Sequence, residues 1–126
     1  MSSLPDADLD RPHYLYRCYA DDVLLYVGVA QDVPSRMFHH LHLCNAGKQP
    51  NGSLRRHMTR HTVERFDTKL DARAAERAAI EAEGPLLNRQ HNPSRFRKAS
   101  GGVYVALEPV HPITAAAFPE ISRSAA

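Results

Sequence analysis

The sequence lacks an apolar run long enough to cross a membrane. Its longest run, at positions 23–30, has eight residues, whereas a membrane-spanning helix needs about 20. It also lacks an apolar segment near the N-terminus, where acidic residues occupy the place of the core of a secretory signal. Only two cysteines are present, which is too few for a disulfide scaffold. We therefore expect a cytoplasmic protein with no membrane partner.

Nothing in the composition indicates disorder along the whole chain. Hydrophobic residues make up 43% of the sequence and charged residues 24%, and both values are ordinary for a globular protein. A length of 126 residues corresponds to one domain of common size. We expect a single compact domain, and the sequence leaves a monomer and a homodimer open.

Acidic residues are scarce in two segments of a chain whose net charge is only +2. Residues 36–65 carry six lysines and arginines against Glu64 alone, and residues 89–98 carry four with no acid. Such patches favour a polyanionic partner such as nucleic acid. They are also typical of solvated faces, so the charge pattern alone leaves both interpretations open.

An antiparallel hairpin is predicted near the N-terminus. An aromatic, alternating strand at 14–19 is followed by the turn residues Asp21 and Asp22 and by an apolar strand at 23–29. Gly28 stands near the end of the second strand. It indicates a place where a side chain would obstruct a close approach of the backbone.

Helices and further strands are predicted after the hairpin. A helix from 33 to about 44 begins at the suitable N-cap Asp32. The other predicted elements are a loop at 45–53, a short helix at 54–60, a strand at 62–70, a helix at 72–83 capped by Asp71 and ended by Gly84, a strand at 103–107, and a tail from 109 that packs as a short helix or stays loose.

Glu76 does not fit the pattern of its predicted helix. On a helical wheel it falls in the sector of Ala72, Ala79 and Ile80, away from the other charged residues. A carboxylate among small apolar side chains is costly unless a cation, a metal ion or water compensates it. The helix alone favours a partly buried salt bridge to an arginine, with a metal ligand as the alternative.

Two tripeptides on the predicted hairpin begin a recognisable pattern, Tyr14-Leu15-Tyr16 and Tyr26-Val27-Gly28. Arg36 follows on the next helix with His40 one turn later, and Glu76 lies on a later helix with Asn88 behind it. In this order the residues resemble the GIY-YIG nuclease family over about residues 12–92. The chain departs from the family in having Tyr14 where the first tripeptide has glycine, and Val29 where the repair enzymes have lysine.

The resemblance implies an α/β fold, with a three-stranded antiparallel sheet flanked by helices in one compact domain. It also implies a metal-dependent endonuclease that hydrolyses phosphodiester bonds of DNA. We accordingly expect a polar lead-in at 1–11, a nuclease domain at 12–92 and a basic C-terminal extension at 93–126. The extension would add one strand and a short helix.

The catalytic residues that the resemblance implies are Tyr16, Tyr26, Arg36, His40 and Glu76. Glu76 would bind one divalent cation, Mg²⁺ or Mn²⁺, because such ions prefer oxygen ligands. Arg36 would neutralise phosphate oxygens with its planar fork of donors. The general base stays open between Tyr26, whose ordinary pKa of about 10 requires help from neighbours, and His40.

Four further residues are expected to contact substrate. Asn88 would tie the end of its helix to the tyrosines or to a phosphate, and Arg55, Arg56 and Arg60 would contact phosphates. The sequence does not distinguish single-stranded from double-stranded DNA. A catalytically inactive nucleic-acid-binding module of the same fold and an RNA-cleaving nuclease are the alternative functions.

Simpler interpretations exist for the same side chains. The tyrosines are also suited to a sheet core, and Arg36 to a solvated helix face. A structural zinc site is the weakest alternative, because paired ligands of the usual kind are not evident. Its candidate ligands are His39, His40, His42, Cys44, His57 and His61.

Overall fold

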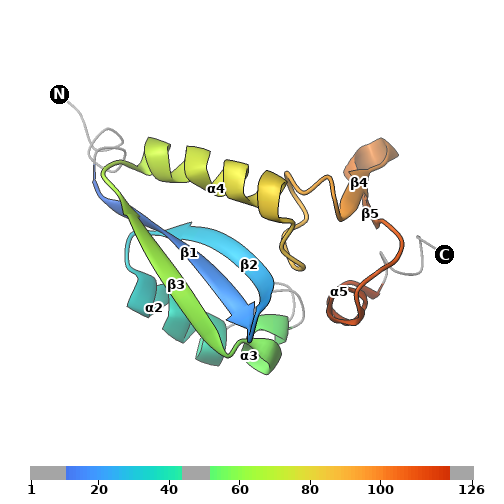
Figure 1. The fold of residues 1–126 in the computed structure, drawn as a ribbon, viewed down its shortest axis with the longest axis horizontal. Coiled ribbons are helices and arrows are strands. Elements are labelled where there is room, and N and C mark those ends of the chain that lie inside the picture. The colour runs from blue at the N-terminus through green and yellow to red at the C-terminus, as the bar shows by residue number, and fades with distance from the viewer. Residues whose placement is uncertain (1–10, 44–51, 120–126) are drawn as a thin grey trace.

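Three strands pair antiparallel around the most aromatic segment of the chain, β1 (His13–Ala20). β2 (Val23–Ala30) and β3 (Arg60–Phe66) flank it in the order β2-β1-β3 (Figure 1). These positions come from a computed structural model, which describes residues 11–43 and 52–119. The hairpin turns at Asp21, whose φ of 53° is a left-handed conformation that aspartate tolerates. The predicted hairpin is confirmed, as is the α/β domain with a three-stranded antiparallel sheet.

The predicted helix from 33 to about 44 consists of two different segments. α2 (Val33–Phe38) begins at Asp32, whose Oδ1 accepts a hydrogen bond from the backbone N–H of Ser35 at 3.1 Å. A short π-helix, η1 (His39–Leu43), continues it. α3 (Ser53–His57) then forms where a short helix was predicted. No helix within the described ranges has the length and apolar character needed to cross a bilayer.

The boundary between β3 and the next helix differs from the prediction. β3 ends at Phe66, and α4 (Lys69–Glu83) already begins after the N-cap Thr68. The hydroxyl of Thr68 accepts a hydrogen bond from the backbone N–H of Asp71 at 3.1 Å. The prediction of Asp71 as N-cap is therefore wrong. Asp71 lies in the first turn instead, where its carboxylate interacts favourably with the positive end of the helix dipole.

The two sides of the sheet have different helical covers. α2 lies on one side and α4 on the other (Figure 1). Because side chains alternate along a strand, Tyr16 and Cys18 belong to the cluster that includes Met37 of α2. Leu15 belongs to the opposite cluster, which α4 completes with Ala79 and Ile80.

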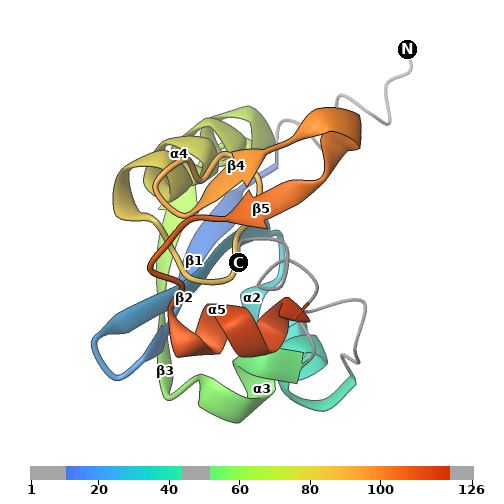
Figure 2. The ribbon, with the colours of Figure 1, turned by 90° about the vertical axis from the view of Figure 1, so that its right-hand side faces the viewer.

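The C-terminal region adds a hairpin and a helix to this arrangement. β4 (Phe96–Lys98) pairs antiparallel with β5 (Tyr104–Ala106), and α5 (Pro112–Ala117) follows (Figure 2). β5 lies within the strand predicted at 103–107, whereas β4 was not predicted. Phe96, Ala106, Ala117 and Phe118 are buried in the same cluster as Tyr16. The region thus packs on the core of the sheet.

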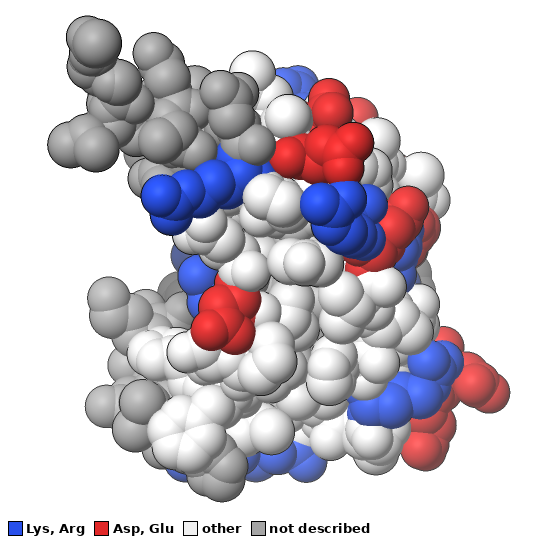
Figure 3. Space-filling view, turned by 90° about the vertical axis from the view of Figure 1, so that its left-hand side faces the viewer, with Lys and Arg blue, Asp and Glu red and all other residues white. Residues whose placement is uncertain are grey.

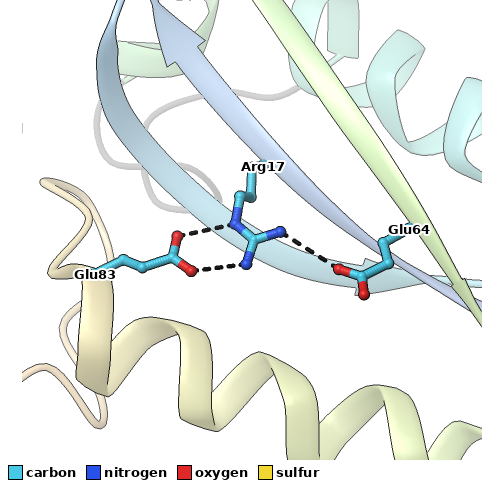
Figure 4. A network of polar contacts seen from close by, with 3 residues as sticks. All are labelled: Arg17, Glu64 and Glu83. Atoms are coloured by element: carbon cyan, nitrogen blue, oxygen red, sulfur yellow. Dashed lines mark hydrogen bonds and ion pairs between the residues drawn. The ribbon is translucent and has the colours of Figure 1, made fainter.

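One arginine links the central strand to its neighbours on the α4 side of the sheet (Figure 4). Arg17 donates from Nε and Nη2 to the two carboxylate oxygens of Glu83, at 2.9 and 2.7 Å. Its Nη1 lies 3.6 Å from a carboxylate oxygen of Glu64 on β3. A two-bond contact between arginine and a carboxylate fixes orientation as well as distance. This contact therefore fixes the C-terminal end of α4 against β1.

Gly28 leaves room for a ring. It is the direct cross-strand partner of Tyr16, and the Tyr16 side chain passes over it. A Cβ at position 28 would lie 2.5 Å from both Cζ and the hydroxyl oxygen of Tyr16, which is far inside contact distance. The obstruction expected at Gly28 thus arises from the tyrosine of the first tripeptide.

Replacing Gly28 with alanine should destabilise the protein by about 1–3 kcal/mol, the usual cost of forcing a group into a packed core. Tyr16 is fully buried, so its ring has no solvent side to which it can move. The free energy of unfolding in urea measures the loss. In a Tyr16→Leu background, the same Gly28→Ala change should cost much less. An equal cost in both backgrounds would contradict the ring as its cause.

Candidate functional site

Three rings from separate segments meet on the α2 side of the sheet. The ring centroids of Tyr16 on β1 and Tyr26 on β2 are 6.2 Å apart. His40 of η1 lies 5.8 Å from the first ring and 5.9 Å from the second. The Tyr16 hydroxyl is 3.0 Å from Nε2 of His40, a hydrogen-bond distance. The structure thus brings together three of the five residues expected to be catalytic.

Arg36 is the fourth member of this group. It lies on α2 one helical turn before His40, and its own side chain is exposed. The guanidinium is close enough to lower the pKa of His40 and to oppose the rise in the pKa of Tyr16. The site therefore has a solvent-facing cation beside a group of aromatic rings.

Burial separates these side chains into an inner and an outer pair. Tyr16 is 0% exposed and His40 only 3% exposed. Tyr26 is half-buried and Arg36 is exposed. A substrate approaching from solvent would therefore meet Tyr26 and Arg36 first, while Tyr16 and His40 support them from behind.

The inner pair is uncharged at neutral pH. Burial lowers the pKa of His40 to about 4, and the cation of Arg36 and the ring of His39 add to this effect. Burial also raises the pKa of Tyr16 well above its ordinary value, with a further contribution from Tyr26. The contact between Tyr16 and His40 is thus a hydrogen bond between neutral groups.

One nitrogen of the His40 ring is not used by this contact. Nδ1 is buried and has no hydrogen-bond partner within the described part of the chain. Either tautomer leaves this nitrogen unpartnered, because Nε2 faces Tyr16 in both. Nδ1 is therefore a free acceptor if the Nε2–H donates to Tyr16, and an unused donor if Tyr16 donates to Nε2.

Glu76, the fifth residue expected to be catalytic, lies on α4 across the sheet from α2. Its side chain is 19% exposed, and Oε1 accepts a hydrogen bond from Nη1 of Arg73 at 3.0 Å. Ala72, Ala79 and Ile80 around it are buried, as the helical wheel predicts. Within the described residues, the hydrogen-bond partner of Glu76 is therefore an arginine on its own helix and not a member of the ring group.

The donor set at Glu76 is compatible with one hard cation. Among the residues that the structure describes, no group of three His, Cys, Asp or Glu side chains lies close enough together to hold a metal ion. A cation at Glu76 would therefore have a single protein carboxylate as ligand. Mg²⁺ commonly keeps several waters and uses only one or two carboxylates, so the residues present fit such an ion. Cys44 of the alternative zinc site lies outside the described residues.

Asn88 binds the strand that carries Tyr26. Its Oδ1 accepts from the backbone N–H of Val27 at 2.9 Å, and its Nδ2 donates to the carbonyl of the same residue at 3.0 Å. The backbone N–H groups of Leu86 and Leu87 donate to Leu24 and Leu25 on this strand. Of the two expected roles for Asn88, this geometry matches the tie to the tyrosine strand.

The three arginines expected to contact phosphate lie in different surroundings. Arg55 and Arg56 are exposed on α3. Arg60 lies 4.0 Å from the ring centre of Tyr19, and its Nε donates to the carbonyl of Asp21 at 3.0 Å. It is thus engaged by the β1–β2 turn. On the face shown in Figure 3, Lys and Arg side chains lie among Asp and Glu rather than in one basic patch.

Sequence reasoning missed one interaction that holds this site in place and anticipated another. The contact of Arg17 with Glu83 joins residues far apart in the sequence, so no local sequence pattern predicts it. The fit of Tyr16 over Gly28 had a signal in the sequence, since a glycine inside an apolar strand marks a close approach.

Comparisons of the chain with protein-family models, curated proteins and solved structures find no match.

The lowered pKa of His40 predicts a loss of stability in mild acid. The unfolded chain takes up a proton as the pH falls through about 6.5, but the folded chain does so only near 4. The contribution of neutral His40 is therefore complete above pH 6.5 and is lost as the pH falls toward 4. Between neutral pH and pH 5 this loss should reach about 1–2 kcal/mol.

A His40→Gln variant isolates this effect, because glutamine can face Tyr16 but does not titrate. Urea unfolding at both pH values should show a smaller loss for the variant than for the unchanged protein. Other acidic and basic groups titrate equally in both proteins and cancel in the comparison. Identical losses would show that His40 is not the group responsible.

Proposed function

We propose that this protein is a divalent-metal-dependent endonuclease of the GIY-YIG type that hydrolyses phosphodiester bonds in DNA. The observation that supports it is the meeting of Tyr16, Tyr26, Arg36 and His40 on one side of the sheet. The motif names these four positions, and they come from two strands and two helical segments. We also propose a cytoplasmic location, which suits the buried free thiol of Cys18.

Arg36 is the residue that would bind the scissile phosphate. Its guanidinium is exposed and offers two donors in the spacing of phosphate oxygens. Removal of a donor that stabilises developing charge typically slows an enzyme by about 100-fold to 1,000-fold. Arg36 therefore carries the charge stabilisation in this proposal.

Tyr26 is the better placed of the two candidate bases to meet the attacking water. It is half-buried, whereas His40 is almost fully buried and its Nε2 already faces Tyr16. His40 would then hold the rings in position as a neutral hydrogen-bond partner of Tyr16. Tyr16 would orient His40.

Glu76 would hold the Mg²⁺ or Mn²⁺ ion, and the resemblance implies that this ion would supply positive charge on the leaving-group side of the phosphate. For this, Arg73 must release the carboxylate, and its exposed position allows that. Asn88 would hold the Tyr26 strand, and Arg55 and Arg56 would contact flanking phosphates.

The second candidate function is a nucleic-acid-binding module without catalysis. The observation that favours it is the ion pair between Glu76 and Arg73, which satisfies the carboxylate without a metal. The two functions differ in whether the purified protein cuts nucleic acid. They agree in expecting it to bind.

Cleavage by the purified protein should require Mg²⁺ or Mn²⁺ and should stop in chelator. Parallel reactions with single-stranded DNA, duplex DNA and RNA identify the substrate.

Arg36→Ala should lower the cleavage rate by about 100-fold to 1,000-fold with the fold intact, because this side chain is exposed. Arg77→Ala is the control, since Arg77 is an exposed helix arginine paired with Glu81. Equal activity of the two variants would contradict the site.

Glu76→Gln should abolish cleavage and leave nucleic-acid binding unchanged. Its melting temperature should change little, because the Arg73 left behind is 54% exposed and exposed ion pairs contribute about 0–1 kcal/mol. Thermal unfolding, binding and cleavage are measured on the same preparation. The expected pattern is that of a lost metal ligand rather than a lost structural bridge.

Glu81→Gln provides a matched control on the same helix. It also removes one negative charge and leaves one exposed arginine, Arg77, without its partner. Only Glu76 lies among the buried alanines. If Glu76→Gln cuts at the rate of Glu81→Gln, Glu76 is not the metal ligand. If the unchanged protein binds nucleic acid but does not cut it, the binding module is the better description.

A further inference from the structure

The β4–β5 hairpin lies apart from the proposed site and has no role in it. Its strands are joined by a short turn, η3 (Ser100–Gly102), and the tip of the hairpin points away from the sheet (Figure 2). At positions 101 and 102 both glycines have positive φ, and no atom lies within 4 Å of where a Cβ would be. The tip is therefore narrow and open.

The base of the hairpin is firmly held. Phe96 and its cross-strand partner Ala106 are buried, and the Phe96 ring packs edge-on against Phe118 at 5.8 Å. The backbone N–H of Leu107 donates to the carbonyl of Arg95 at 2.8 Å. The outer half of the hairpin is thus presented by a rigid base.

The outer half carries two exposed cations. Arg97 and Lys98 are adjacent on β4, so they point to opposite faces of the two-stranded ribbon. Nζ of Lys98 lies 5.8 Å from the ring centre of Tyr104, its cross-strand partner. No acidic residue occurs in the sequence between Glu83 and Glu108, so no neighbour along the chain neutralises them.

These two cations differ from most other arginines of the described chain. Four arginines form ion pairs, namely Arg17, Arg65, Arg73 and Arg77. Three others are engaged by rings or carbonyls, namely Arg60, Arg89 and Arg95. Within the described ranges, no ion pair joins Arg97 or Lys98 to an acid, and the side chain of Lys98 contacts only the ring of its cross-strand partner Tyr104. Their charge is available to an external partner.

We propose that the β4–β5 hairpin is a second contact for duplex DNA, gripping the phosphate backbone through Arg97 and Lys98. The inference rests on the proposed function for the identity of the polyanion. A two-stranded ribbon fits the major groove, and the open glycine tip lets it approach closely. Cations on both faces can then reach the phosphates that border the groove. Such contacts position the duplex without reading its sequence.

Binding of duplex DNA in chelator, without cleavage, tests the proposal. Arg97→Gln/Lys98→Gln should weaken binding about tenfold or more near physiological salt and lower the slope of log affinity against log salt by about two. The charge-matched control is Arg65→Gln/Arg77→Gln, which removes two exposed cations already paired with acids. Its affinity and slope should stay close to those of the unchanged protein. The swapped variant Arg97→Lys/Lys98→Arg should also bind normally, because phosphate contact needs the charges alone.

The outcomes separate this inference from the proposed function. Unchanged binding by the double variant, or an equal loss in the charge-matched control, overturns the role of the hairpin even if the protein cuts DNA. Loss of binding confined to the double variant supports the hairpin even if no cleavage is ever detected. Failure of the unchanged protein to bind duplex DNA overturns it as well. Melting temperatures of all variants should agree, because the replaced side chains are exposed.

Discussion

The site depends on the passage of the Tyr16 ring over Gly28. Only a residue without a side chain leaves that space, and only there does the Tyr16 hydroxyl reach Nε2 of His40. This hydrogen bond connects β1 to η1, and η1 continues directly from the helix that carries Arg36. A close contact between two strands thus determines where the exposed cation of the proposed site lies. The tyrosine of the first tripeptide and the glycine of the second therefore pack directly against each other.

Adjacent residues of β1 act on opposite sides of the sheet. Tyr16 points toward α2 and the rings, whereas Arg17 points toward α4 and holds Glu83. Side-chain alternation along a strand makes this division unavoidable. The phosphate-binding arginine and the metal-binding glutamate of the proposal are therefore carried by helices on opposite faces. The burial of Ala79 and Ile80 against Leu15 and the contact of Arg17 with Glu83 together hold the second of these helices on the sheet.

Much of the fold follows from local signals. Alternation and turn residues place β1 and β2, Asp32 places α2, and Gly84 ends α4, because each acts on its immediate neighbours. The start of α4 was misjudged because Thr68 and Asp71 are both good N-caps, and only the hydrogen bond between them decides. β4 has three residues and no alternating pattern, so its pairing depends on packing against Phe118. The motif predicts the four residues that meet in the site. Which of them face solvent depends on how the fold buries them, and the sequence does not show this.

Counting basic residues along the sequence overstates the charge that a polyanion can use. Within the segment 36–65, Arg60 stacks on Tyr19 and Arg65 pairs with Asp67. Each engaged guanidinium would have to lose a contact before it could bind a phosphate, which offsets the gain. Among the described residues, the cations without an acidic partner include Arg36 beside the rings and the pair on the β4–β5 hairpin. A basic patch in a sequence therefore becomes a binding surface only where folding leaves the cations without acids, and here that leaves a few separate points rather than one broad face.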